Sequence, residues 1–374
     1  MNTKTIAAAA VAVWLACGVA AQARADKAEA AELAKRRIDP FTQGDAKSMN
    51  ALGVVAYGPF PWADDRRTED LEKVLGEGRL LWLETPHFLI GCSLPASGVP
   101  EEPEARKLLN AELQRLNKRC RKVPDRASKL EPWLRVHLYA LRAEELYAEV
   151  AALVGHDAAS GTHLGQKAKF PLLLFEKKSD ASRYLEHFCG RKSVGAMAPV
   201  HYPKTDQQGL VLCAEADEPR DDAAIHVQFR YLLAGALLDA AGSFPHWLQT
   251  GIAHHFERQV SSTMMLAAPR ADEHVDQATQ NKWLEKLQGR ARHDGLLAPF
   301  RDLVGNYDLG YFGHLQAWSR VQFLWRDEAK FRALLQELRE GGSADPQLAA
   351  IERIYGFDAE GFDVAWRDWL RRQR

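Results

Sequence analysis

The residues best able to do chemistry lie between positions 222 and 257. His226 and Arg230 are four residues apart in an apolar helical pattern, so they share one face of an expected helix. Thr250 follows Arg230 by 20 residues, on a second expected helix that begins after a Gly/Pro turn. His226 and Arg230 thus place an imidazole and a guanidinium on one helix face, and Thr250 adds a neutral hydroxyl from the second helix.

The stretch from Pro245 to Glu257 resembles the proline-x-Trp-Leu-x-Glu-Gly-x-Ala-x-x-x-Glu signature of gluzincin metallopeptidases, the peptidase-MA-like superfamily. The matching residues are Pro245, Trp247, Leu248, Gly251, Ala253 and Glu257. In that family, an HExxH motif on the preceding helix supplies two histidine ligands, and the first glutamate of the signature supplies a third. The resemblance implies a zincin-like fold. It places His226 at the first ligand, Val227 at the catalytic glutamate, Arg230 at the second ligand and Thr250 at the third.

Three of these four key positions depart from the family. Val227 has no carboxylate to take a proton from a metal-bound water. The Arg230 guanidinium stays protonated and brings a positive charge to the place of a dication. Thr250 offers a neutral hydroxyl, which leaves His226 as the only ligand of the family's type. The sequence thus predicts a degenerate site without zinc or another cofactor, and without confident catalytic residues.

Neighbouring residues leave alternatives open. His246, His254 and His255 could rebuild a metal site with the first-ligand histidine, but the family pattern gives them no ligand role. We expect them to be surface or packing histidines. A later helix is similar to the one that follows the zinc helices in this superfamily, where a tyrosine can stabilise the tetrahedral intermediate. Tyr311 is the nearest candidate there, and the favoured interpretation is a core helix that packs Leu315, Trp318, Phe323 and Leu324 inward. GxSxG, P-loop and GxGxxG motifs do not occur in the sequence.

Hydrophobic periodicity predicts the elements that position these residues. The expected strands lie at 80–94 with a break at Pro86, and at 170–175, 197–202 and 209–215. The expected helices before residue 200 are 104–122, 132–154 and 180–188. From residue 221 onward the pattern is almost wholly helical, and the last helix buries Phe362, Trp366 and Trp369. The sequence predicts an α+β protein: an N-terminal mixed sheet with helices, followed by a mainly helical C-terminal half.

The chain divides into four expected segments. Residues 1–25 have the features of an export signal: Lys4, an alanine-rich apolar run, and a small-x-small cleavage site that ends at Ala25. A lipoprotein alternative would use Cys17. Residues 26–77 are an irregular lead-in, 78–216 an α/β subdomain, and 217–374 a helical zincin-like subdomain. The resemblance covers residues 26–168 poorly and says nothing of their role.

Composition limits the partners and the compartment. The 374 residues are 46% hydrophobic and 26% charged, with a formal charge of −1, so no basic excess favours nucleic acid. No later stretch reaches the roughly 20 apolar residues of a membrane span. We expect an exported protein, periplasmic or extracellular. There, the cysteines beyond the signal can form one or two structural disulfides or stay as buried thiols, with the pairing open: Cys92, Cys120, Cys189 and Cys213.

These features favour an exported metallopeptidase-like protein that has lost zinc and peptidase activity. It would act as a binding or scaffolding module for an extended peptide or another envelope protein. An active hydrolase with a non-standard metal site and a structural envelope protein are the alternatives. Two further expectations concern geometry. Arg230 should pair with a carboxylate such as Glu257 or Asp222 and hydrogen-bond toward Thr250. Strand 209–215 could form an exposed edge that pairs with a peptide, and the alternative is an edge covered by residues 26–77 or by a partner chain.

Overall fold

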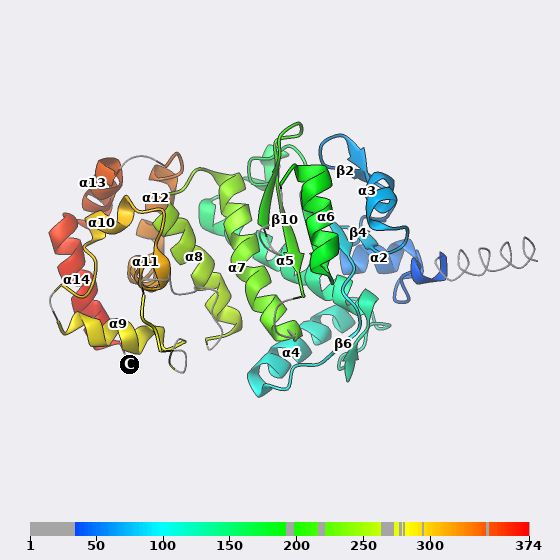
Figure 1. The fold of residues 1–374 in the computed structure, drawn as a ribbon, viewed down its shortest axis with the longest axis horizontal. Helices are drawn as coiled ribbons and strands as arrows, with labels where there is room; N and C mark the ends of the chain where they lie inside the picture. Colours follow the sequence, from blue (N-terminus) through cyan, green and yellow to red (C-terminus); the bar gives the residue numbers. More distant parts are fainter. Residues whose placement is uncertain are drawn as a thin grey trace, which may run out of the picture.

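The computed structural model describes residues 34–191, 198–215, 221–262, 273–276, 279, 281–293, 295–341 and 344–373. The expected signal 1–25 and Cys17 lie outside these residues. Within the described part, the strands end at Cys213 and only helices follow (Figure 1). The protein is α+β, with a mixed sheet in its N-terminal half, as the hydrophobic pattern predicts.

One six-stranded sheet organises the N-terminal half. Its central strands β5, β8 and β10 are parallel and almost fully buried, and the outer pairs are antiparallel. Across the sheet the order is β1 (Ala56–Tyr57), β4 (Leu81–Glu84), β5 (Phe88–Cys92), β8 (Phe170–Phe175), β10 (Gln207–Cys213) and β9 (Ala198–Tyr202). Two small ribbons accompany it, β2 (Pro61–Trp62) with β3 (Arg66–Arg67) and β6 (Ser97–Gly98) with β7 (Lys129–Leu130).

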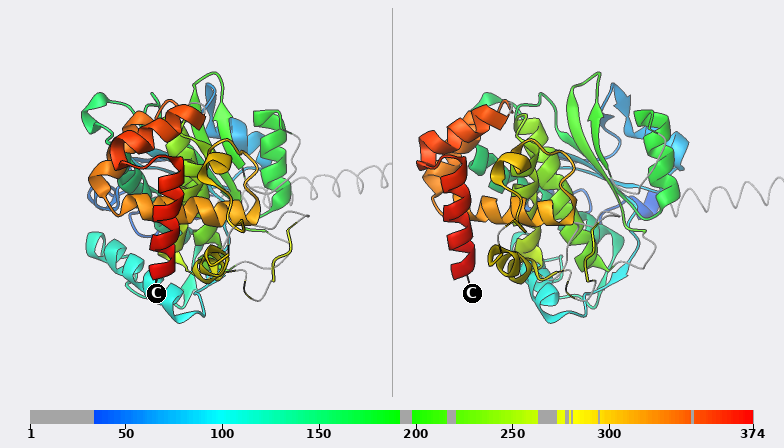
Figure 2. Two further views of the ribbon diagram at one scale, coloured as in Figure 1. Left: turned by 90° about the vertical axis from the view of Figure 1, so that its left-hand side faces the viewer. Right: turned by 60° about the vertical axis from the view of Figure 1, so that its left-hand side comes forward.

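The two faces of this sheet pack against different helices, because successive side chains of a strand point to opposite sides. In β8, Leu172 and Leu174 belong to the large core shared with α4 (Pro103–Arg119), α5 (Pro132–Val154) and α7 (Asp222–Ala241). Leu173 and Phe175 belong to a second core with α3 (Thr68–Leu75) and α6 (Lys178–Cys189). Figure 2 shows α6 on the side of the sheet away from α7. The all-apolar run 170–175 is therefore a strand covered on both faces.

Residues 34–77 correct the expectation of an irregular lead-in. They form α2 (Ala46–Leu52), α3 and β1 to β3, and β1 pairs with β4 at the edge of the main sheet. Buried Asp39 anchors this segment: its carboxylate accepts hydrogen bonds from the Thr42 hydroxyl (2.7 Å) and the Tyr57 hydroxyl (2.5 Å), and lies 3.1 Å from His137 Nε2 on α5. Gly and Pro residues hide these short elements in the sequence, and the anchoring contact spans 98 residues.

Strand β10 corrects a second expectation, since it does not lie at the edge of the sheet. It pairs with β8 on one side and with β9 on the other. The prediction of an exposed edge at 209–215 is therefore wrong. A tight turn after β9 returns the chain antiparallel beside it, so that β9 becomes the last strand.

The C-terminal half packs helix on helix. Helix α8 contacts both α7 and α11, and a Cβ at Gly251 would meet the Ala317 carbonyl oxygen at 2.6 Å, so this contact requires glycine. In the last helix, Phe362 and Trp366 are fully buried and Trp369 is partly buried. The helices are α8 (His246–Val260), α9 (Trp283–Ala291), α10 (Phe300–Val304), α11 (Gly310–Trp325), α12 (Glu328–Glu337), α13 (Ala344–Tyr355) and α14 (Ala359–Arg372), with the 3-10 turn η1 (Ala158–Ser160) in the first half.

The four described cysteines are free thiols rather than disulfide partners. Cys92, Cys120 and Cys213 are buried, and Cys189 is half-buried. The sequence leaves disulfides and buried thiols open, and in the structure these cysteines are thiols. Among the described helices, none combines the length and the apolar character that crossing a membrane requires.

Candidate functional site

The expected site residues lie on an antiparallel pair of helices, α7 and α8. Asp221 caps α7 by accepting the Ala224 N–H at 2.9 Å. The direction of the pair follows from its cross-contacts: Gln249, early in α8, reaches the carbonyl of Gly235, late in α7. The hairpin of two helices that the sequence predicts is therefore present.

His226 lies on α7 where it faces α4 and α5. Its imidazole is buried, and Nε2 is 3.9 Å from a Glu112 carboxylate oxygen. Burial, together with the nearby Arg142 and Arg230 guanidinium groups, lowers the pKa of His226 well below its usual value. His226 and Val227 line a small hollow of about 30 Å³. The position expected for the first ligand therefore holds a buried, neutral ring between an acid and guanidinium groups.

A group of four buried charges lies beside His226, and we call it the charge network: Glu112, Arg135, Arg142 and Asp222. Arg142 donates to Glu112 at 2.8 and 3.0 Å and to Asp222 at 3.0 Å. Arg135 donates to Asp222 at 3.1 Å and to the Pro95 carbonyl at 2.8 Å. All four side chains are at most 3% exposed. Two acids and two guanidinium groups neutralise each other here, which is the condition for burying charge.

Arg230 corrects the predicted pairing. Its partners are not Glu257 or Asp222 but Glu149 on α5, at 3.3 Å, and the Gln259 side-chain oxygen, at 2.6 Å. The guanidinium side chain is 9% exposed, whereas that of Glu149 is 41% exposed. Arg230 thus extends along α8 toward its C-terminal end and away from Thr250. Its cation is paired as expected, with a different acid.

Thr250 and Glu257 belong to a second buried group on the α8 side. Thr250 is buried on α8, close to Tyr231 of α7. Glu257, fully buried, accepts a short hydrogen bond from His254 Nδ1, and His254 Nε2 lies 2.8 Å from His314 Nδ1 on α11. We call Glu257, His254 and His314 the histidine chain. Burial lowers the pKa of His254 to about 3 and that of His314 to about 3, so both rings are neutral near pH 7.

The remaining expected residues have packing roles. His255 stacks on Trp325 with ring centroids 4.2 Å apart, and His246 stacks on exposed Tyr307 at 6.0 Å. The Tyr311 ring is fully buried in a core with α9 and α14, and Leu315 and Leu324 of the same helix are buried as expected. The candidates named from the sequence are therefore divided among separate contacts and do not converge on one point.

Sequence reasoning missed most of both buried groups. Arg135 and Arg142 stand in the apolar pattern of helix 132–154, where a charged residue needs a partner, and that signal could have been used. The sequence marks Asp222 only as an expected partner of Arg230. His254 and Glu257 are three residues apart, on one helix face, which also predicts a pair. His314 carries no local signal, because its partner lies 60 residues away.

The residues at the expected zinc position do not fit zinc. Val227 and Thr250 lack the required donors, and Arg230 brings a cation that is already paired. Both ring nitrogens of His254 are engaged, by Glu257 and His314. Over the described ranges, no group of three or more His, Cys, Asp or Glu side chains is placed to hold a metal ion. The contacts of the α7–α8 hairpin orient its polar side chains and neutralise their charges, and they do not form a metal site.

Comparison with known proteins adds no family. The sequence matches none of the models of known protein families and none of the curated proteins. The resemblance to gluzincin metallopeptidases therefore rests on the α7–α8 residues themselves.

Proposed function

We propose that this chain is an exported, zincin-like protein that has lost zinc and peptidase activity and that acts as a binding or scaffolding module for a peptide or an envelope protein. One observation carries the proposal: Arg230, at the position of the second zinc ligand, is a buried cation held by Glu149 and Gln259. A dication beside it would meet a fixed positive charge.

The surroundings support the same conclusion. His226 is a buried neutral ring, and the acids near it are already engaged by the guanidinium groups of Arg142 and Arg230. Val227 is a buried apolar residue at the place of the catalytic base. Gly251, one of the residues shared with the signature, allows the close contact of α8 with α11. A fold that retains its packing but not its donors is suited to binding without cleavage.

Restoring the missing ligands tests the zincin register directly. The triple variant Val227→Glu, Arg230→His and Thr250→Glu recreates the family's donor set around His226. After dialysis, we expect about one zinc per chain by elemental analysis for this variant and none for the wild type. Adding His226→Ala to the triple variant is the matched control and should abolish binding.

Two results would contradict the proposal. Stoichiometric zinc in the wild-type protein would favour the alternative of an active hydrolase with a non-standard site. A folded triple variant without zinc, with an unchanged circular dichroism spectrum, would contradict the zincin register. The binding role is tested separately by titrating the wild type with an unfolded polypeptide such as reduced casein: we expect association without cleavage, and no association would favour a structural envelope protein.

A further inference from the structure

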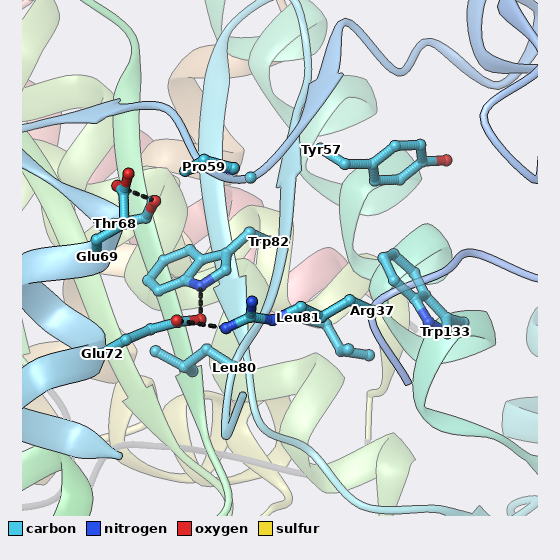
Figure 3. A pocket seen from close by; sticks show the side chains of 11 residues that line it. Arg37, Tyr57, Pro59, Thr68, Glu69, Glu72, Leu80, Leu81, Trp82 and Trp133 are labelled. Atoms are coloured by element: carbon cyan, nitrogen blue, oxygen red, sulfur yellow. Dashed lines mark hydrogen bonds and ion pairs between the residues drawn. The ribbon is translucent and has the colours of Figure 1, made fainter. Parts of the chain in front are cut away.

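A pocket of about 90 Å³ lies at the β1–β4 edge of the sheet, the edge opposite to β9. Helix α3 lines it with Glu69 and Glu72, β4 with Trp82, and β1 and α5 with Tyr57 and Trp133. Figure 3 shows the Trp82 indole between the carboxylates of α3 on one side and Tyr57 and Trp133 on the other. The pocket is distinct from the α7–α8 hairpin and does not depend on the zincin likeness.

The walls of the pocket are fixed by contacts behind them. The Trp82 indole N–H donates to Glu72 Oε1 at 2.9 Å, and the Trp133 indole N–H donates to the Arg36 carbonyl at 2.9 Å. Tyr57 and Trp133 meet edge to face, with centroids 5.5 Å apart. A Cβ on Gly58 would lie 2.7 Å from the Trp82 Cβ, so the backbone passes directly over this tryptophan. The site is therefore built before any ligand arrives.

One cation of the chain already uses this site. Arg37 Nη2 donates to Glu72 Oε2 at 2.6 Å, at the pocket's rim (Figure 3). The Glu72 side chain is 12% exposed, whereas that of Arg37 is 42% exposed. An ion pair with one partner this far in solvent contributes little net stability, so another cation can take its place at low cost.

The remaining chemistry favours a cation with an apolar stem. Two carboxylates line the pocket: Glu72 pairs with Arg37, and Glu69 pairs with Arg67 at 3.5 Å from outside the lining. Aromatic rings attract cations through their electron-rich faces, and carboxylates bind guanidinium in a planar geometry. Leu80 and Leu81 line the pocket as well and offer apolar surface to methylene groups.

We propose that this pocket binds a guanidinium group on an aliphatic stem, from an arginine side chain of a peptide or from a free arginine-like molecule. The incoming group replaces Arg37 on Glu72 Oε2 and lies among the rings of Tyr57, Trp82 and Trp133. Arg37 then acts as the pocket's own competitor, holding Glu72 until the ligand arrives.

Calorimetric titration with Nα-acetyl-arginine amide tests this on the full chain. Arg37→Ala removes the competitor, and we expect about fivefold tighter binding than in the wild type. Adding Glu72→Gln to Arg37→Ala should weaken binding about tenfold, because a charge-assisted hydrogen bond is lost. The neutral citrulline analogue should not bind. Lys107→Ala, which breaks an exposed ion pair with Glu104 on α4, is the matched control and should leave the affinity unchanged.

Two further arms decide the ligand's source. Tighter binding of the peptide Ala-Ala-Arg-Ala-Ala than of free arginine supports the pocket and identifies a peptide partner, and the reverse order supports it and identifies a free small molecule. Equal binding of citrulline and arginine, or an affinity unchanged by Arg37→Ala, would overturn the proposal. The unfolding midpoint of each variant should equal that of the wild type within error, which shows that a change in affinity comes from the site and not from misfolding. Because no variant here touches α7 or α8, these outcomes are independent of the zinc measurements.

Discussion

The charge network and the histidine chain flank the same pair of helices but bury polar groups in opposite ways. Between α4, α5 and α7, the side chains keep their charges, because each acid lies within 3.1 Å of a guanidinium. Between α8 and α11, the imidazoles stay neutral, because burial disfavours their charged form. The first group depends on its partners being present, and the second depends on the pH.

Arg230 combines features of both groups. Its guanidinium is buried and charged, as in the charge network, but its partner Glu149 is 41% exposed. Its partner can be solvated if the pair is broken, whereas the partners of Asp222 cannot. The loss of unfolding free energy on substitution in the charge network, in the histidine chain or at Arg230 should therefore depend on how exposed the remaining partner is.

The largest effect is expected for Asp222→Asn. This change leaves the guanidinium groups of Arg135 and Arg142 buried with half of their counter-charge, and a broken buried pair costs about 3–5 kcal/mol of unfolding free energy. Urea denaturation measures it. Asp221→Ala is the matched control, one residue away: it removes only the cap of α7 and should cost about 1 kcal/mol. A loss for Asp222→Asn no larger than that of the control would show that the network is not held by charge.

Acid should affect the histidine chain first. Both rings have a pKa near 3 in the folded protein and about 6.5 when unfolded, so their contribution to stability is complete above pH 6.5 and is lost as the pH falls. Between pH 7 and 5, each ring lowers the free energy of unfolding by up to about 2 kcal/mol.

The pH experiment separates the two regions. Asp222 has a lowered pKa, because its guanidinium partners outweigh burial, so its contribution is lost only as the pH falls below about 3.8. We expect His314→Gln to reduce the fall in unfolding free energy between pH 7 and 5, and the exposed-histidine control His201→Gln to leave it unchanged. Equal slopes for the wild type and His314→Gln would contradict the neutral-ring interpretation.

Arg230→Met should destabilise the protein less than Asp222→Asn does. The substitution removes the bonds to Glu149 and Gln259 but leaves behind an acid that water can reach, so we expect a loss of about 1–2 kcal/mol. Thermal and urea unfolding measure it. A neutral or stabilising effect would show that Arg230 is not held by its pair and would weaken the argument against a cation at this position.

The smallest effect is expected for Glu149→Gln. With its side chain 41% exposed, this acid should contribute less than about 1 kcal/mol. The double variant with Arg230→Met gives the coupling energy of the pair by a mutant cycle. A coupling as large as the loss in Asp222→Asn would mean that this pair is as dry as the charge network, contrary to the observed exposure.

Much of the fold was readable from local patterns. The helix predicted at 132–154 and the strand predicted at 170–175 have the same limits in the structure, because a Pro start, a Gly stop and an unbroken apolar run are local signals. The predicted break at Pro86 separates β4 from β5. The lead-in could not be read in the same way, since β1 is two residues long and is defined by its pairing with β4.

The sequence by itself determined which donors stand at the expected zinc position. No fold can turn the side chains of Val227, Arg230 and Thr250 into zinc ligands, because donor type is a property of the residue. Only the tertiary structure decided how the remaining polar groups are satisfied. Arg230 meets Glu149 rather than Glu257, and His254 meets His314, because partners 81 and 60 residues away in the chain are brought together by helix packing, which no local spacing encodes.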